Sequence, residues 1–98
     1  MPEELLIDVK SYLHITWVDA EMDKNLTGFI NRGMARLQEI AGVPLDFEVE
    51  ASARALLFDY CRYANSQALE MFEKNFISEL LSLHIKSQVD AVEDVVIP

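Results

Sequence analysis

The sequence has few of the residues that many classes of fold and site require. It contains one cysteine, three glycines and three prolines in 98 residues. A lone cysteine excludes an intrachain disulfide framework and a multi-cysteine zinc site, and so few turn formers argue against a many-stranded β-sandwich. Basic residues are scarce as well, since 8 Lys and Arg face 17 Asp and Glu and the formal net charge is -9. A protein whose main task is to bind nucleic-acid phosphates needs the opposite balance.

Long apolar runs and a basic leader are also missing. The chain starts with the acidic sequence MPEE, whereas a secretory signal starts with basic residues followed by an apolar run. No apolar run approaches the ~18–20 residues that a membrane-spanning helix needs. We therefore expect a protein of a reducing cytoplasm that does not bind membranes, with Cys61 as a free thiol. The content of 51% hydrophobic and 26% charged residues is typical of a globular domain.

Apolar residues recur at helical spacing along almost the whole chain, and this pattern predicts an all-α fold. We expect one compact domain over residues 1–89, built from four amphipathic helices over about 3–14, 19–41, 46–70 and 73–88. Residues 90–98, acidic and then apolar, show no helical period and predict an extended C-terminal tail. The expected buried stripe of the third helix includes Val49, and that of the fourth includes Ile77, Leu81 and His84.

Several residues mark the expected helix ends. The second helix starts either with a capping box of Thr16 and Asp19 or with Asp19 alone as N-cap. Gly42 is placed to end it, and Pro44 prevents its continuation. Asp46 is expected to cap the third helix, while the pair at 65–66 (Asn-Ser) either bends that helix or ends it early.

The candidates for reactive chemistry have simpler structural explanations. Cys61 lies within the apolar stripe of the third helix, as expected of a buried structural thiol. His14 ends the first helix and His84 lies on an apolar stripe, so packing or helix-end roles are expected for both. Asp19, Glu21 and Asp23 alternate like a calcium loop, but the loop's required Gly and Glu are absent and the acids suit a helix N-terminus. We expect neither catalytic nor metal-binding residues, no cofactor and no enzymatic activity.

Protein-interaction residues are the remaining candidates. Arg32 and Arg36 share one face of the second helix, and they form either a solvated face or a surface for an acidic partner. Trp17 and Val18 either fill the core or anchor a contact with another protein. In the tail, the apolar residues either fray or add to a neighbour's surface as an extended segment. These tail residues are Val95, Val96 and Ile97.

Read in order, four segments resemble the phage head–tail connector family, the small helical adaptors of tailed phages and prophages. Residues 9–15 (VKSYLHI) are similar to that family's V-K-x-Y-L-x-I start. A polar stretch and a helix follow over 19–41. Residues 56–65 (LLFDYCRYAN) resemble its tyrosine- and arginine-bearing third helix, and 76–83 (FISELLSL) its F-x-x-E-L-x-x-L close. The resemblance covers about residues 5–85, although Trp17 and Val18 stand where the family is commonly polar.

The resemblance implies a structural role in the virion. Members of the family assemble as rings beneath the portal of a filled capsid, extend the DNA channel and dock the next head-completion or tail protein. It implies three protein partners: further copies of this chain in a ring that forms in solution or only on the portal, the portal protein, and the next protein of the tail. DNA would pass through without specific binding, and the chain would reside in the host cytoplasm until assembly.

Two other functions compete with this one. High negative charge is also typical of a small acidic regulator or DNA mimic that blocks a nucleic-acid-binding host protein. Against it, the carboxylates gather at helix starts and chain ends and do not line one face. An accessory subunit of a cytoplasmic enzyme is the third possibility, and no motif in the sequence favours it.

Overall fold

Helices account for nearly all of the architecture of this protein. The computed structural model describes residues 2–49 and 52–95, and the side chains of 4–49 and 52–90. The described residues form no strand, as the sequence predicts. The helices are α1 (Pro2–Tyr12), α2 (Ala20–Ala41), α3 (Ser52–Asn65), the 3-10 turn η1 (Leu69–Met71), α4 (Phe72–Asn75) and α5 (Ile77–Val95).

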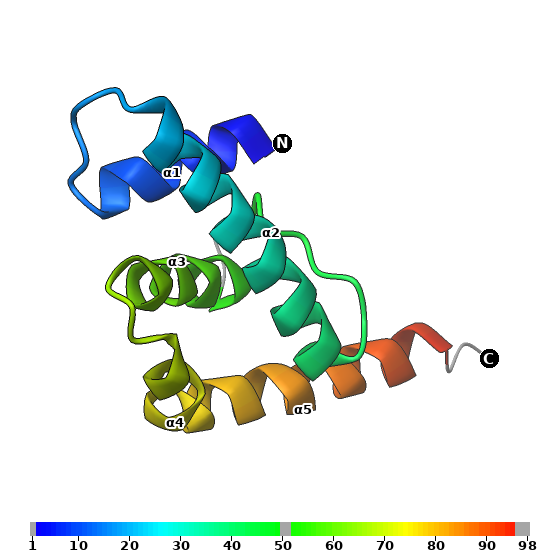
Figure 1. Ribbon diagram of the computed structural model, residues 1–98. Coiled ribbons are helices and arrows are strands. Elements are labelled where there is room, and N and C mark those ends of the chain that lie inside the picture. The colour runs from blue at the N-terminus through cyan, green and yellow to red at the C-terminus, as the bar shows by residue number, and fades with distance from the viewer. Residues whose placement is uncertain (1, 50–51, 96–98) are drawn as a thin grey trace.

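The long helix α2 organises the molecule. It contacts α1 near one end and α5 near the other, and α3 packs along it between them (Figure 1). Within the described residues α1 and α5 do not touch each other. The buried core therefore runs along α2 and is shared among all the helices. Its fully buried members are Val9, Leu26, Ile30, Leu37, Ala41, Leu57, Cys61 and Phe72.

The ends of α2 follow the sequence signals closely. The side chain of Asp19 accepts hydrogen bonds from the backbone N–H groups of Glu21 and Met22, at 2.9 and 3.2 Å. Asp19 alone is therefore the N-cap, and Thr16 takes no part. At the other end, Gly42 has a φ of 78° and its N–H bonds to the carbonyl of Gln38, the left-handed cap that glycine adopts without strain.

Two shorter helices also end at a residue with a left-handed backbone conformation, but this residue is not a glycine. His14 follows α1 with a φ of 60°, and the N–H of Ile15 reaches back to the carbonyl of Lys10 at 2.9 Å. After α3, Gln67 has a φ of 57° and the N–H of Ala68 bonds to the carbonyl of Tyr63 at 2.9 Å. Both are Schellman motifs, which satisfy carbonyls that a helix end otherwise leaves unpaired.

The third helix is shorter than the predicted range of 46–70. Asp46 does not cap it; its carboxylate accepts from the N–H of Glu48 at 3.0 Å in a turn that precedes the helix. Phe47 is buried, and its carbonyl accepts a hydrogen bond from Arg54. This local turn and the anchoring of Phe47 keep residues 46–49 out of the helix, whose described part is Ser52–Asn65. Val49, expected on the buried stripe, is exposed.

The predicted single helix over 73–88 is interrupted and shifted. Phe76 leaves the helical conformation, with φ −111° and ψ 22°, and separates α4 from α5. Its ring stacks on Phe72 and meets Tyr63 edge-on, at centroid distances of 5.1 and 5.6 Å. This aromatic cluster fastens the turn between α3 and α5, and it fixes the break at Phe76.

The C-terminal segment is helical for longer than the sequence pattern predicted. Helix α5 continues through residue 90 to Val95, so no extended tail forms over 90–95. No Gly or Pro interrupts residues 90–95, so a helix already anchored to the domain can continue through them. The predicted interaction residues Val96 and Ile97 lie outside the described residues.

Candidate functional site

The thiol of Cys61 is placed where it cannot react. It is fully buried in the core, and burial raises its pKa to about 12. A thiol with such a pKa stays protonated at neutral pH, whereas catalysis and metal binding need the thiolate. Cys61 is therefore the structural core residue that the sequence predicts.

The two histidines serve helix ends. His14 is the left-handed residue that terminates α1. On α5, His84 Nδ1 donates to the carbonyl of Ile40 at 2.8 Å, and Gln88 Nε2 donates to that of Ala41 at 2.8 Å. These two side chains satisfy carbonyls at the end of α2, which would otherwise lack partners. Their hydrogen bonds also fix the angle at which α5 crosses α2.

Acidic residues are dispersed and not gathered into a site. Among the described side chains of residues 4–49 and 52–90, no group of three or more His, Cys, Asp and Glu is arranged to hold a metal ion. In the same part of the chain, no helix is long and apolar enough to cross a membrane.

The two arginines predicted as interaction residues lie on the same helix but have different surroundings. Arg36 binds Glu73 of α4 through two hydrogen bonds, Nε to Oε2 at 2.7 Å and Nη2 to Oε1 at 2.8 Å, and it also pairs with Glu39. These hydrogen bonds hold the pKa of Glu73 below its ordinary value. Arg32 is exposed and lies over the ring of Phe29 at 5.3 Å. Arg36 thus ties α4 to α2, and the pair forms no continuous basic surface.

Trp17 and Val18 are exposed in the connection between α1 and α2. Their exposed fractions are 53% and 91%. Trp17 therefore does not fill the core, and Ile15, two residues earlier, is the buried side chain of this connection. Beside it is a hollow of about 470 Å³ between α1 and residues 14–16, lined in part by Ile7, which is 66% exposed.

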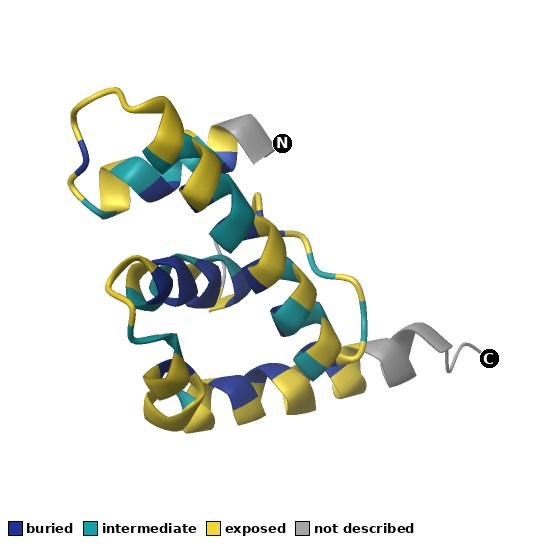
Figure 2. Cartoon of the chain, in the orientation of Figure 1, coloured by how far each residue is buried: buried dark blue, intermediate teal, exposed yellow. Residues whose placement is uncertain are grey.

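A second exposed apolar surface lies on α5, and sequence reasoning missed it. Ile77, Leu81, Ile85 and Val89 are 62%, 55%, 53% and 51% exposed. They are spaced four residues apart and form one row, which we call the α5 outer row. The expectation that Ile77 and Leu81 are buried is wrong, because Leu80 and Leu83 supply the buried face. Figure 2 shows buried and exposed stretches alternating along α5. The signal was in the sequence: α5 has more apolar positions than one buried stripe can use.

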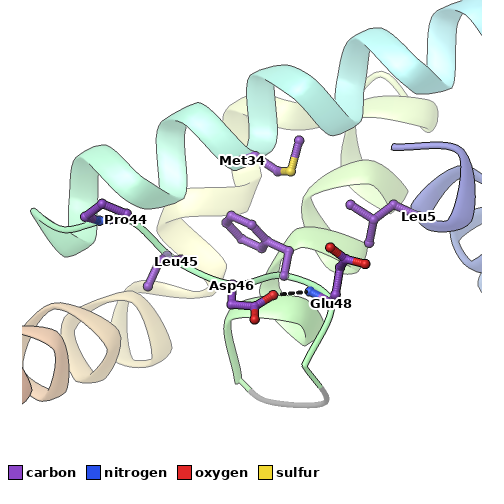
Figure 3. Close-up of a pocket in the computed structure, with 7 residues that line it drawn as sticks. Leu5, Met34, Pro44, Leu45, Asp46 and Glu48 are labelled. Atoms are coloured by element: carbon purple, nitrogen blue, oxygen red, sulfur yellow. Dashed lines mark hydrogen bonds between the residues drawn. The ribbon is translucent and has the colours of Figure 1, made fainter. Parts of the chain in front are cut away.

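A third feature is a wide hollow of about 650 Å³ beneath residues 44–48. Leu5, Met34 and Leu45 line it with apolar groups, and the carboxylates of Asp46 and Glu48 lie at its edge (Figure 3). Gln38 holds this segment in place by accepting a hydrogen bond from the N–H of Leu45 at 2.9 Å. The lining pairs no nucleophile with a base, so the hollow suits a side chain of another protein better than a reaction.

The described part of the chain is therefore an all-α domain whose distinctive exposed features are apolar surfaces. Comparison of the sequence and structure with protein-family models, curated proteins and solved structures finds no match.

Proposed function

We propose that this protein is a structural component of a tailed phage or prophage, a head–tail connector that assembles as a ring below the portal. In this role it extends the DNA channel and docks the next head-completion or tail protein. The observation that carries the proposal is the α5 outer row, a line of four aliphatic side chains that are each more than half exposed. The sequence resemblance over about residues 5–85 indicates which kind of assembly, the ring of a head–tail connector, the chain would form.

The exposure of this apolar row supports an assembly role. All four side chains of the α5 outer row are more than half exposed, and a contiguous apolar patch on a protein surface is often an interaction site. Water contact with this surface costs free energy that burial against a partner would recover.

The distribution of charge favours a connector over a DNA mimic. Among the described residues, the carboxylates of Asp8, Asp23, Glu39, Asp59 and Glu73 are held in ion pairs with the protein's own cations. Those carboxylates are tied to the protein's own cations and do not present a phosphate-like array. The net charge of -9 nevertheless suits the wall of a channel, because an acidic wall repels DNA and lets it slide.

The proposal is tested in the phage or prophage that encodes the chain. Deleting the gene should leave DNA-filled heads without tails in electron micrographs, and the wild-type gene supplied in trans should restore tailed particles. Normal tailed particles from the deletion strain would contradict the proposal.

Two substitutions on α5 sharpen this experiment. Leu81→Asp places a charge in the α5 outer row and should fail to restore tails. Lys86→Asp places the same residue on the same helix outside the row, where Lys86 is exposed, and should restore them. Circular dichroism and thermal unfolding of both purified variants show whether each one folds.

A further inference from the structure

We infer that the hollow beneath residues 44–48 is a docking site for a basic segment of another protein. A bulky apolar side chain of that segment enters the hollow, and a lysine or arginine next to it meets the carboxylates at the edge. The inference goes beyond the connector role, because it concerns a different surface from the α5 outer row and holds for any kind of assembly.

The hollow has an apolar interior with room for a large side chain. Leu5 and Phe47 are buried in its lining, whereas Met34 and Leu45 are only half-buried (Figure 3). An apolar side chain from a partner would therefore remove apolar surface of Met34 and Leu45 from water. The volume of about 650 Å³ lies within the ~300–1,000 Å³ of pockets that bind ligands.

Hydrogen bonds hold the segment over 44–48 in place across this hollow. The N–H of Leu45 donates to the side chain of Gln38 at 2.9 Å, and Arg54 donates to the carbonyl of Phe47 at 3.1 Å. The buried ring of Phe47 anchors the segment to the core. A partner would thus meet a site that is already formed, and binding would cost little ordering of the chain.

The charge at the edge of the hollow favours a basic partner. Among the described residues that line the hollow, only Asp46 and Glu48 are charged, and both are exposed. Asp46 accepts a hydrogen bond from the N–H of Glu48 at 3.0 Å and is in no ion pair with a described residue. Arg54, which reaches this segment, is already paired with Asp8. The net charge of -9 also attracts basic proteins at long range.

A second copy of this chain and an uncharged apolar ligand are the other possible occupants. A second copy carries the same charge of -9, so the two copies repel each other. An uncharged ligand would fill the hollow but would take water from the carboxylates at its edge without replacing it by a partner. A segment that is both basic and apolar matches the interior and the edge.

Three fluorescein-labelled peptides and the purified full chain test the inference. The peptide GSKKWLKKSG combines an apolar pair with lysines. GSEEWLEESG replaces the lysines with glutamates, and GSKKSSKKSG replaces the apolar pair with serines. Fluorescence anisotropy at low ionic strength measures the affinities, and amide NMR spectra of the wild-type chain locate the bound peptide.

The inference predicts that the first peptide binds at least about tenfold more tightly than each of the other two. Its affinity should fall as salt is added, because screening weakens the contact with the carboxylates. The amide signals that shift on binding should be those of Met34 and residues 45–48.

Variants of Asp46 show whether the carboxylate at the edge takes part. Asp46→Lys should weaken binding of the first peptide by at least about fivefold. Glu70→Lys makes the same change of charge at an exposed position of η1, outside the lining, and should weaken it by less than about twofold. Asp46→Asn keeps an acceptor for the N–H of Glu48 and should still weaken binding by about twofold or more, which separates loss of charge from loss of the turn.

Several results would each overturn the inference. They are no binding of the first peptide, equal binding of either of the other two, shifted amide signals confined to another part of the molecule, and equal effects of Asp46→Lys and Glu70→Lys. The gene-deletion experiment tests the connector role separately, so either proposal can fail while the other stands.

Discussion

Replacing Gly33 with alanine provides a direct test of the packing between α2 and α3. A Cβ atom at Gly33 would lie 2.8 Å from Leu57 Cδ1 and 2.8 Å from Tyr60 Cδ1, closer than carbon atoms can approach. Both neighbours are buried, so neither can swing into solvent. Overpacking of this kind costs ~1–3 kcal/mol. Alanine also has a higher helix propensity than glycine, and this offsets up to ~1 kcal/mol of that cost.

Gly28 on the same helix is the matched control. A Cβ atom there would meet only the guanidinium of Arg32, at 3.2 Å, and this flexible end of an exposed side chain can move. Only the gain in helix propensity, up to ~1 kcal/mol, then remains.

The two alanine substitutions should therefore change stability in opposite directions. The net cost of Gly33→Ala is up to about 2 kcal/mol. With ~4–8 °C of melting temperature per kcal/mol in a domain of this size, Gly33→Ala should lower the melting temperature by up to about 16 °C and Gly28→Ala should raise it by up to about 8 °C. Thermal unfolding followed by circular dichroism measures both. Equal shifts, or a stabilised Gly33→Ala, would refute the close packing of α2 on α3.

Three further predictions concern single residues. His14→Gly should stabilise the protein by up to about 1 kcal/mol in urea unfolding, because the φ of 60° that strains histidine suits glycine; a loss of stability would contradict the left-handed end of α1. The Arg36–Glu73 pair lowers the pKa of Glu73, so it should stabilise the fold above about pH 4.5, and this contribution should be lost as the pH falls through the lowered value. The difference in stability between wild type and Glu73→Gln should accordingly be present at pH 7 and vanish in acid; a difference that persists in acid would contradict it. Cys61 should resist thiol reagents at pH 8 in the folded state and react fully in denaturant, and rapid native labelling would disprove its burial.

Local signals predicted those parts of the fold that local chemistry determines. The start and end of α2 follow from Asp19 and Gly42, because a side-chain cap and a left-handed glycine act within one turn of the chain. The core face of α2 follows from apolar spacing alone. Helix breaks that depend on tertiary contacts could not be predicted from the sequence. Phe76 interrupts the last predicted helix because its ring packs on Phe72 and Tyr63.

The candidate site was only partly predictable for a related reason. Trp17 and Val18 were recognisable as a large aromatic and an aliphatic residue in a connection, but only the structure decides between the core and the surface. Ile77 and Leu81 have the same spacing as core residues, so periodicity cannot tell which of two apolar faces of α5 meets α2. Arg36 was a candidate for binding a partner, and its actual partner, Glu73, is distant in sequence.

Binding of the purified chain to the portal protein of the phage or prophage proposed to encode it tests the proposed connector function most directly. The account predicts that native mass spectrometry of the mixture detects a portal complex carrying many copies of this chain, and that Leu81→Asp, but not Lys86→Asp, abolishes the bound copies. A wild-type chain that folds yet leaves the mass of the portal unchanged would contradict the account.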